Sequence, residues 1–278
     1  MPELIEVEHT CRILNQSKGQ SLSGIKNSKY ISSLYKFSKS KPSALKKIVN
    51  FKLVEWQRHG KKLFAQFKDS KNNSFYLYSH LGMSGSWRTL STDSPLPKHS
   101  HLQLIFKNKT KLVYVDPRRF GHLDLIEELP EFQAPDPFVD KKFNGLWIFK
   151  KIQNSNKQIK ELLLDQKIFA GIGNYLASEI LYHAKISPFL LGKDISLEEC
   201  KLLKKSITAI LKRAYKAGGL SMRDYVIPDG QKGIMKLKIK VYGRDGELCS
   251  NHPKTEDIKI LKCTIAQRAT FYCASCQS

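Results

Sequence analysis

Residues 111–126 of the 278-residue chain read KLVYVDPRRFGHLDLI. The runs 111–116 and 122–126 are short, alternate in polarity and are rich in residues that favour β-strands. Between them, DPRRFG contains the Pro and Gly that are typical of turns. The stretch therefore predicts two strands with a cationic, Phe-containing loop at a strand end.

The neighbouring sequence contains more strands of the same kind. Further runs rich in β-formers occupy 51–58, 61–67, 74–80 and 101–106. The turn-forming sequences KDSKNN (68–73) and KNKT (107–110) separate neighbouring strands. Because the connections are short, the region from about 50 to 126 predicts a mostly antiparallel sandwich.

The N-terminus, MPELIEVEHTCRIL, has two interpretations. Apolar residues at 4, 7, 11 and 14 predict an amphipathic helix, and Pro2 suits its first turn. Alternatively, removal of Met1 turns Pro2 into a free secondary amine, which is a nucleophile. This stretch alone leaves both open.

Composition indicates the class of partner. Lys and Arg number 47 against 25 Asp and Glu, a formal charge of +22, which favours nucleic acid over an anionic membrane. No apolar run of 18 residues and no signal-peptide pattern occur, so no membrane association is expected. Three of the six cysteines fall in the last 16 residues, which in a chain without an export signal favours metal over disulfides. These features predict a soluble intracellular protein that binds nucleic acid.

Beyond the sandwich, helices dominate. Residues 127–145 contain several Pro and acidic residues without periodicity and are interpreted as part of a linker. Apolar faces near 159–163 and 176–184 predict two helices, and the capping box SLEE (196–199) opens a long third one that Gly218-Gly219 ends. The predicted order is sandwich, helical domain and small metal module.

The sequence GIGN (171–174) lies between two helical segments. Gly171 and Gly173 allow backbone N–H groups to approach a phosphate, and Asn174 adds a side-chain donor at the start of a helix. A plain helix–turn–helix packing unit explains the pattern equally well.

The C-terminal tail contains two pairs of candidate metal ligands. Cys249-x2-His252 and Cys273-x2-Cys276 have the spacing of two halves of a structural zinc site. Cys263 competes with His252 as the fourth ligand, and free cysteines in a basic tail are the alternative. The segment between the pairs predicts a hairpin that carries Arg268 towards phosphate.

Two loops at strand ends place an apolar side chain beside polar or cationic ones. HLGMSG (80–85) contains His80 and Met83, and DPRRFG (116–121) contains Arg118, Arg119 and Phe120. Apolar wedges flanked by Arg are suited to entering a base stack. A turn with a packed hydrophobe remains the simpler interpretation of either loop taken alone.

Taken in order, six motifs resemble those of the formamidopyrimidine-DNA glycosylase family, the Fpg/Nei group of base-excision repair enzymes. They are PEL-x-EVE, HLGMSG, DPRRFG, G-x-GN-x-x-ASE, VYGR-x-G and QRATFYC-x-x-CQ. The resemblance covers almost the whole chain. It implies an α+β fold: an N-terminal antiparallel β-sandwich with flanking helices, a helix–two-turn–helix domain and a C-terminal β-hairpin zinc finger. The expected domains are 1–135, a linker 136–149, 150–237 with a lesion-capping loop, and a zinc finger 238–278.

The resemblance also implies roles for individual residues. Pro2 would be the nucleophile and Glu3 the acid/base, supported by Glu6, with Lys61 as the lysine of the catalytic cleft. The expected DNA-binding residues are His80, Met83, Arg118, Arg119, Phe120, Lys160, Asn174, Tyr242 and Arg268. The expected ligands of one structural Zn²⁺ are Cys249, His252, Cys273 and Cys276.

The implied activity is that of a bifunctional DNA glycosylase and AP lyase, which acts through a Schiff base at Pro2 with β,δ-elimination. PEL, DPRRFG and GGLSMRDY (218–225) favour the Fpg branch, with 8-oxoguanine and formamidopyrimidines as substrates. An oxidised-pyrimidine glycosylase and a non-catalytic binder of damaged DNA are the alternatives. We expect a monomer that acts on double-stranded DNA containing oxidised bases or abasic sites, cytoplasmic and nucleoid-associated if the source is bacterial.

Three positions depart from the family pattern. Ile5 and His252 stand where the family usually has Pro and Cys, and Leu176 stands two residues after Asn174, where the family has Tyr. None of these removes a group with an implied catalytic role. Three thiolates and one imidazole can still hold zinc tetrahedrally.

Overall fold

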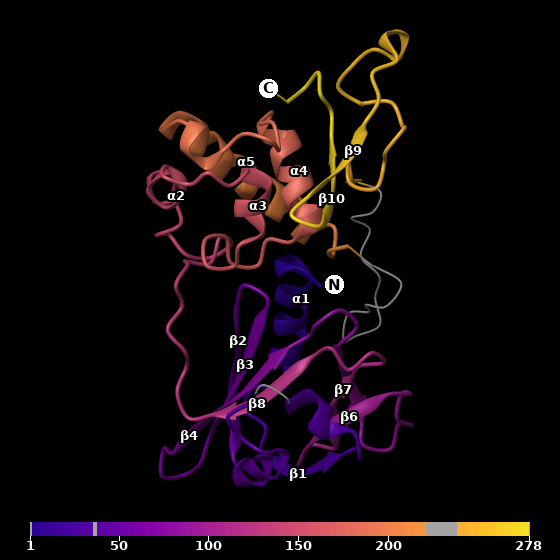
Figure 1. Cartoon of the computed structure of the whole chain (residues 1–278). Helices are drawn as coiled ribbons and strands as arrows, with labels where there is room; N and C mark the ends of the chain where they lie inside the picture. Colours follow the sequence, from indigo (N-terminus) through magenta and orange to yellow (C-terminus); the bar gives the residue numbers. More distant parts are fainter. Residues whose placement is uncertain (1, 36–37, 221–237, 278) are drawn as a thin grey trace. The chain divides into compact units, whose positions relative to one another are not determined.

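The computed structural model describes residues 2–35, 38–220 and 238–277. These form two compact units (Figure 1). The first contains residues up to Glu131 together with Gly218–Leu220, and the second contains Phe132–Ala217 and residues 238–277. The expected lesion-capping loop falls largely on 221–237, outside the described residues.

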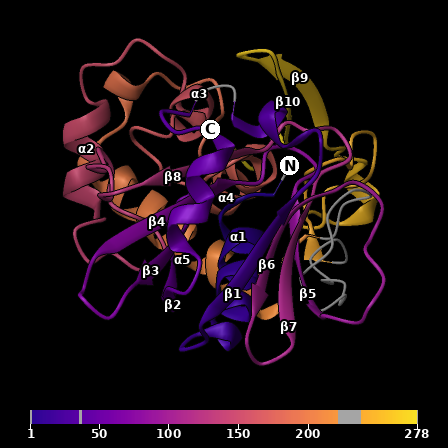
Figure 2. The same ribbon diagram turned by 90° about the horizontal axis from the view of Figure 1, so that it is seen from below.

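The first unit is an antiparallel β-sandwich with one flanking α-helix, α1 (Leu4–Leu14). One sheet has the order β1-β6-β7-β5 and the other the order β2-β3-β4-β8, which Figure 2 shows as two separate groups of strands. The strands are β1 (Leu22–Asn27), β2 (Lys52–His59), β3 (Lys62–Lys68), β4 (Ser74–His80), β5 (Ser86–Ser91), β6 (Ser100–Phe106), β7 (Thr110–Val115) and β8 (His122–Ile126). Short 3₁₀ helices cover Asn15–Ser17, Ile31–Tyr35 and Pro42–Ile48.

Aromatic side chains join the two sheets. Trp56 of β2 meets Trp87 of β5 edge-on at 5.2 Å, and Trp87 meets Tyr114 of β7 at 5.3 Å. All three are buried. Such edge-to-face pairs contribute roughly 0.5–1.5 kcal/mol beyond their buried area. Helix α1 packs against β2 and β3 of one sheet and β5 of the other, so it lies beside both layers.

The six predicted strands are present, and the α+β fold class is confirmed. Strands β1 and β5 were not predicted. Strand β1 is largely exposed or half-buried and contains Gly24, so it lacks the apolar alternation that marks a strand. Strand β5 follows the HLGMSG loop directly, and only its first two residues are buried.

The second unit contains four helices and a hairpin. The helices are α2 (Gly145–Ile152), α3 (Ile159–Leu164), α4 (Asn174–Ala184) and α5 (Leu197–Lys216), with short 3₁₀ helices at Gly192–Asp194 and Lys254–Glu256. The predicted capping box is confirmed: the Glu199 N–H donates to Ser196 Oγ, and Glu199 Oε2 accepts from the Ser196 N–H at 2.8 Å. Helix α5 ends at Lys216, and Gly218 takes the left-handed φ of 71° that follows many helices.

Residues 145–149 of the expected linker form the first part of α2. The Asn144 side chain caps this helix by accepting from the Trp147 N–H at 2.9 Å. Ala134 and Phe143, also within or beside the expected linker, are buried. This packing was not predicted, because the apolar residues of the Pro-rich, acidic segment are few and irregularly spaced.

The predicted hairpin is formed by β9 (Leu261–Ile265) and β10 (Arg268–Tyr272). Its two-residue turn places Ala266 and Gln267 at φ 47° and 59°. Positive φ at both positions is the type I′ geometry, whose twist matches that of the flanking strands. Arg268 therefore begins β10 directly after the turn, paired with Ile265.

Within the described part of the chain, no helix has both the length and the apolar character needed to cross a bilayer.

Candidate active site and metal centre

The N-terminal turn of α1 gathers two buried carboxylates next to Pro2. Pro2 is itself buried and lies just before the N-cap residue, Glu3. Glu3 and Glu6 form a capping box, in which the Glu3 N–H donates to Glu6 Oε2 at 2.8 Å. Carboxylates are stabilised here because the first turn presents free N–H groups and the positive end of the helix dipole.

Glu6 has a second partner. Its other oxygen, Oε1, accepts from the Leu220 N–H at 2.7 Å. Gly219 lies so close that an added Cβ would be 2.8 Å from Glu6 Oε1, and its φ is 78°. Glu6 is thus held at both oxygens by backbone donors, which suits the supporting role implied for it.

Lys61 lies in the tight turn between β2 and β3 and is buried. The neighbouring residue Gly60 has φ 56°, and Arg58 Nη1 donates to its carbonyl at 3.1 Å. Strand pairing places Lys62 opposite His80 at the end of β4, and His80 opposite His122 of β8. The turn with Lys61 and the loop that starts at His80 therefore share one end of this sheet.

The environment of His80 keeps its imidazole neutral. Burial, followed by the charges of Lys61, His122 and Lys62, lowers the pKa of His80 to about 4. Its Nδ1 accepts from the Gly82 N–H at 3.2 Å, which leaves the proton on Nε2. His80 can therefore donate one hydrogen bond from Nε2 without carrying a charge.

The two predicted wedge loops touch one another. A Cβ on Gly82 would lie 2.3 Å from the Phe120 carbonyl oxygen, and one on Gly121 would lie 1.8 Å from the Tyr114 hydroxyl. Only glycine allows so close an approach. HLGMSG and DPRRFG thus form a single joint surface.

A fully buried carboxylate, Asp116, holds this surface together. Its Oδ1 accepts from Ser84 Oγ at 2.6 Å and from the Arg118 N–H at 3.3 Å, while Oδ2 accepts from the Gly121 N–H at 2.8 Å. No role was predicted for Asp116, although an Asp at the end of a buried strand and directly before a Pro-containing turn commonly stabilises that turn.

The side chains that point out of the joint surface are those predicted as a wedge. Met83 and Phe120 are 43% and 55% exposed. The Arg118 guanidinium lies 4.6 Å from the centre of the Phe120 ring, whereas Arg119 stacks over Tyr30 at 5.1 Å. These apolar residues are therefore not packed turn hydrophobes, the simpler interpretation of the sequence.

In the second unit, the start of α4 is tied to the hairpin. Asn174 begins α4, and its Nδ2 donates to the Ala269 carbonyl of β10 at 2.9 Å. Lys160 of α3 is fully buried, and its Nζ donates to the Asn174 carbonyl and to Ser178 Oγ. The structure thus brings Lys160 and Asn174 together.

Glu179, which belongs to the quoted ASE motif, organises the segment around Tyr242. Its buried carboxylate accepts from the backbone N–H groups of Lys240, Val241 and Tyr242 at 2.9–3.0 Å. Tyr242 is half-buried between the rings of Tyr175 and Phe271. No role was predicted for Glu179, because its carboxylate accepts from backbone N–H groups about sixty residues away in the chain and a local pattern does not show such contacts.

Arg268 is exposed at the hairpin turn, as expected for a residue that reaches a phosphate. The neighbouring β10 residues differ from it: Thr270 and Phe271 are buried. The second unit therefore presents Arg268 outward on a rigid two-stranded support.

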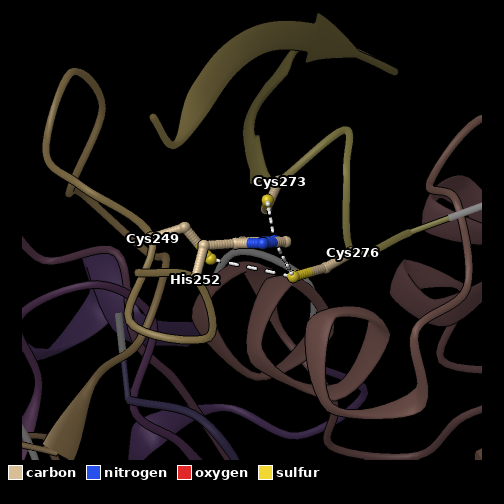
Figure 3. Close-up of side chains that lie close together, drawn as sticks. All are labelled: Cys249, His252, Cys273 and Cys276. Carbon is tan, nitrogen blue, oxygen red and sulfur yellow. Dashed lines mark hydrogen bonds between the residues drawn. The ribbon is translucent and has the colours of Figure 1, made fainter. Parts of the chain in front are cut away.

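The four predicted metal ligands converge (Figure 3). The ligand atoms of Cys249, His252, Cys273 and Cys276 all lie within 4.8 Å of one another. Cys249 Sγ and Cys276 Sγ are 3.7 Å apart, and tetrahedral Zn–S bonds of about 2.3 Å put two sulfurs roughly 3.7–3.8 Å apart. The residues present therefore fit a four-coordinate metal ion.

Cys263 lies outside this cluster. It occupies β9, paired with Thr270, so the geometry groups His252, and not Cys263, with the other three candidate ligands. The surroundings support His252: its Nδ1 lies 3.4 Å from Glu256 Oε2, the carboxylate–imidazole contact that orients many metal-bound histidines. Gln277 accepts from the Cys273 N–H at 2.9 Å and so fixes the ligand segment. Neither Glu256 nor Gln277 was predicted to support the site.

Comparison with known proteins agrees with these observations. The N-terminal domain of formamidopyrimidine-DNA glycosylase matches residues 1–123, and the H2TH domain of the same enzyme matches residues 133–226. A formamidopyrimidine-DNA glycosylase of Salmonella schwarzengrund is 39% identical over 226 residues, 80% of each chain.

Solved structures match over the full length of both chains. A variant of the Lactococcus lactis Fpg protein in complex with DNA containing Fapy-dG has a TM-score of 0.86 and 34% identity. A MutM protein in complex with DNA containing carbocyclic 8-oxo-G has the same TM-score and identity. The chain therefore belongs to the formamidopyrimidine-DNA glycosylase family of DNA glycosylase enzymes.

Proposed function

We propose that the chain is a bifunctional DNA glycosylase and AP lyase that excises oxidised purines through an imine at Pro2. The observation that carries this proposal is the position of Pro2: it is buried directly before a helix whose first turn holds two buried carboxylates, Glu3 and Glu6. A secondary amine next to acid/base groups is what imine chemistry needs.

In the proposed reaction, Met1 is removed and the Pro2 nitrogen attacks C1′ of the damaged nucleoside. The bond between C1′ and the base breaks, and the base leaves with a proton. The C1′–O4′ bond of the resulting aminal then breaks as O4′ takes up a proton, which leaves an iminium between Pro2 and C1′. Glu3 supplies and takes up protons during opening of the sugar ring. Glu6 keeps the turn in place through its two backbone donors.

The iminium also explains strand cleavage. It acidifies the C2′ proton, whose loss breaks the C3′–O bond in β-elimination. A second elimination breaks the C5′–O bond, and hydrolysis of the imine frees Pro2. Both phosphates leave as anions, so nearby cations favour these steps.

Lys61 and His80 are proposed to contact the phosphates near the lesion. Lys61 supplies a charge, and neutral His80 supplies a directed donor at Nε2. Their closeness is supported by the effect of the Lys61 charge on the pKa of His80.

Met83, Arg118 and Phe120 are proposed to fill the gap left by the flipped nucleotide. Exposed apolar side chains on a surface fixed by Asp116 are suited to insertion into a base stack. Arg119 is proposed to contact the backbone beside them.

In the second unit, Asn174 and Arg268 are proposed to bind phosphate directly. The N-terminal end of α4 favours an anion, and Arg268 is exposed. Lys160 and Tyr242 are packed more deeply, which supports a role in shaping this surface.

The cluster of Cys249, His252, Cys273 and Cys276 is proposed to hold Zn²⁺. An ion with four protein ligands would have no open position, so it would stabilise the fold of the hairpin module and take no part in the reaction.

Cleavage of defined duplexes tests the proposal. We expect cleavage of DNA with 8-oxoguanine or a formamidopyrimidine opposite cytosine, and of abasic sites, by the Met1-processed chain. Glu3→Gln and Lys61→Leu should bind these duplexes but lose strand cleavage, by at least about 100-fold.

Other outcomes have clear meanings. Faster excision of an oxidised pyrimidine would assign the chain to the pyrimidine-directed branch. Tight binding of all lesions without any cleavage would make it a non-catalytic binder of damaged DNA. Equal cleavage by both variants would remove Glu3 and Lys61 from the mechanism.

A further inference from the structure

The N-terminal motif PEL-x-EVE contains a third acidic residue, Glu8, that the proposed mechanism does not use. Glu8 lies on α1, the helix that begins just after Pro2 and Glu3, and it is only 8% exposed. Burying a carboxylate is unfavourable unless it is paired. Its partners therefore indicate its purpose.

Glu8 binds two arginines, one through each oxygen. Arg12 Nε donates to Oε1 at 2.6 Å, and Arg58 Nε donates to Oε2 at 2.8 Å. The Arg12 side chain is 58% exposed and lies one turn along the same helix, whereas the Arg58 side chain is 2% exposed and belongs to β2. Of these two contacts, the one with Arg58 connects α1 to another element, β2.

Arg58 also holds the turn beside Lys61. Its Nη1 donates to the Gly60 carbonyl at 3.1 Å, and Gly60 is joined directly to Lys61. A guanidinium is a rigid fork with five donors, so one arginine can bind a carboxylate and a turn carbonyl at once. A lysine has one flexible point charge and cannot reproduce both contacts in fixed geometry.

The carboxylate of Glu8 is ionised at neutral pH. Burial acts to raise its pKa, but the hydrogen bonds and charges of Arg12 and Arg58 outweigh burial, so the pKa of Glu8 is lowered. The contact between Glu8 and Arg58 is therefore a buried, charge-assisted ion pair.

We propose that Glu8 and Arg58 are positioning residues, which fix the Lys61 turn relative to the helix that begins at Pro2 and Glu3. The inference rests on the proposed function for its catalytic consequence. Neither residue touches a reacting atom; they act through α1 and the Gly60 carbonyl. Small displacements of reacting groups cost about 100-fold in rate, so loss of the Glu8–Arg58 pair should lower the rate of cleavage measurably.

Three variants test the proposal. The double variant Glu8→Gln, Arg58→Met removes both buried charges together and so avoids an unpaired one. Arg58→Lys keeps the charge but loses the fork. Arg12→Gln is the matched control, because it removes the other cation on Glu8 and leaves the Lys61 turn untouched.

Four properties are measured for each variant: thermal unfolding, duplex binding, the single-turnover rate of strand cleavage, and the pKa of His80 by NMR. The pKa of His80 reports on the Lys61 turn because, after burial, the Lys61 charge is the largest cause that lowers it.

For the double variant and Arg58→Lys we expect a rate about 10- to 100-fold lower, with duplex affinity nearly unchanged. The pKa of His80 should rise from about 4 towards its ordinary value. Arg12→Gln should leave the rate and the His80 titration as in the unmodified chain.

A double variant that melts like the unmodified chain and also cleaves at its rate, with the same His80 titration, would overturn the proposal. If the double variant does not fold, the same readouts on Arg58→Lys decide. If the unmodified chain cleaves no lesion, the proposed function fails, and the His80 titration still decides whether the pair positions the turn.

Discussion

The β-sandwich and the hairpin module hold their polar groups by different means. The sandwich has a large apolar core, and its buried carboxylates Glu3, Glu6 and Asp116 accept hydrogen bonds from backbone N–H groups and, at Asp116, also from the Ser84 hydroxyl. The hairpin module, residues 238–277, packs around a small apolar cluster, which among the described residues has six buried members. One is Tyr182 of α4, and two of the others, Cys249 and Cys273, are candidate metal ligands. Small modules with so little apolar area commonly need a metal or disulfide.

This difference predicts which changes should destabilise each part. The sandwich should tolerate metal removal but not the loss of a buried carboxylate. The hairpin module should tolerate surface changes but not the loss of a ligand. The predictions below separate these two kinds of stabilisation, from the largest effect to the smallest.

Loss of a metal ligand should have the largest effect. Structural zinc contributes about 10–16 kcal/mol in small finger modules, so Cys273→Ser or a strong chelator should unfold the hairpin module and abolish duplex binding. NMR signals of the sandwich should stay in place. Cys263→Ser is the matched control, since Cys263 lies nearby but outside the cluster. Equal damage from both cysteine variants would contradict a metal-held module.

Loss of the Asp116 carboxylate should have the next largest effect. Asp116→Asn replaces one acceptor oxygen with an NH₂ group that cannot accept from Ser84, Arg118 or Gly121, at a cost of about 2–4 kcal/mol. This loss of stability is measured by thermal unfolding. The control is Asp140→Asn, which changes a half-buried residue that accepts from the Lys142 N–H, with an expected cost of about 0.5 kcal/mol. Similar losses for the two would show that Asp116 is not a special support.

Acidification should weaken the sandwich through His80. Its folded pKa of about 4 lies below the ordinary 6.5, so the unfolded chain binds the proton first. The stability contribution is complete above pH 6.5 and is lost as pH falls towards 4, by at most about 3 kcal/mol. Denaturant unfolding between pH 7 and 4 should show this slope, and His80→Gln should flatten it. Parallel curves for the two proteins would contradict the assigned environment.

Removal of an exposed wedge residue should have the smallest effect on stability. Phe120→Ala should change the free energy of unfolding by less than about 0.5 kcal/mol, because the ring is 55% exposed. The same substitution should weaken binding to a duplex with one abasic site by about 1 kcal/mol, which is the typical contribution of one stacked base. Leu96→Ala, which removes a similarly exposed side chain (46%), should leave this affinity unchanged. Equal affinity losses would mean that Phe120 is no wedge.

Local patterns in the sequence predicted much of this structure. Six strands and the capping box of α5 follow from periodicity and from turn and capping residues, which depend on neighbours in the chain. The Cys-x2-His and Cys-x2-Cys pairs predicted the metal cluster for the same reason. The β9–β10 hairpin was predicted from its place between the two pairs of candidate metal ligands. Periodicity failed at β1 because that strand has little apolar alternation.

Contacts between distant residues could not be predicted in this way. The choice of His252 over Cys263 depends on how β9 pairs with β10, and spacing does not reveal that. The Glu8–Arg58 pair spans fifty residues, and the Glu6–Leu220 bond spans more than two hundred. Nothing local marks either acidic residue as paired, because a Glu in or just after the first turn is also common on solvent-exposed helices.

Borohydride trapping tests the central claim most directly. The Met1-processed chain is incubated with a duplex that carries one 8-oxoguanine opposite cytosine, reduced with borohydride and separated on a denaturing gel. The account predicts a covalent protein–DNA band that is absent with Pro2→Gly and with a chain that retains Met1. A band of equal strength with Pro2→Gly, or cleavage without any trapped species, would contradict Pro2 as the nucleophile.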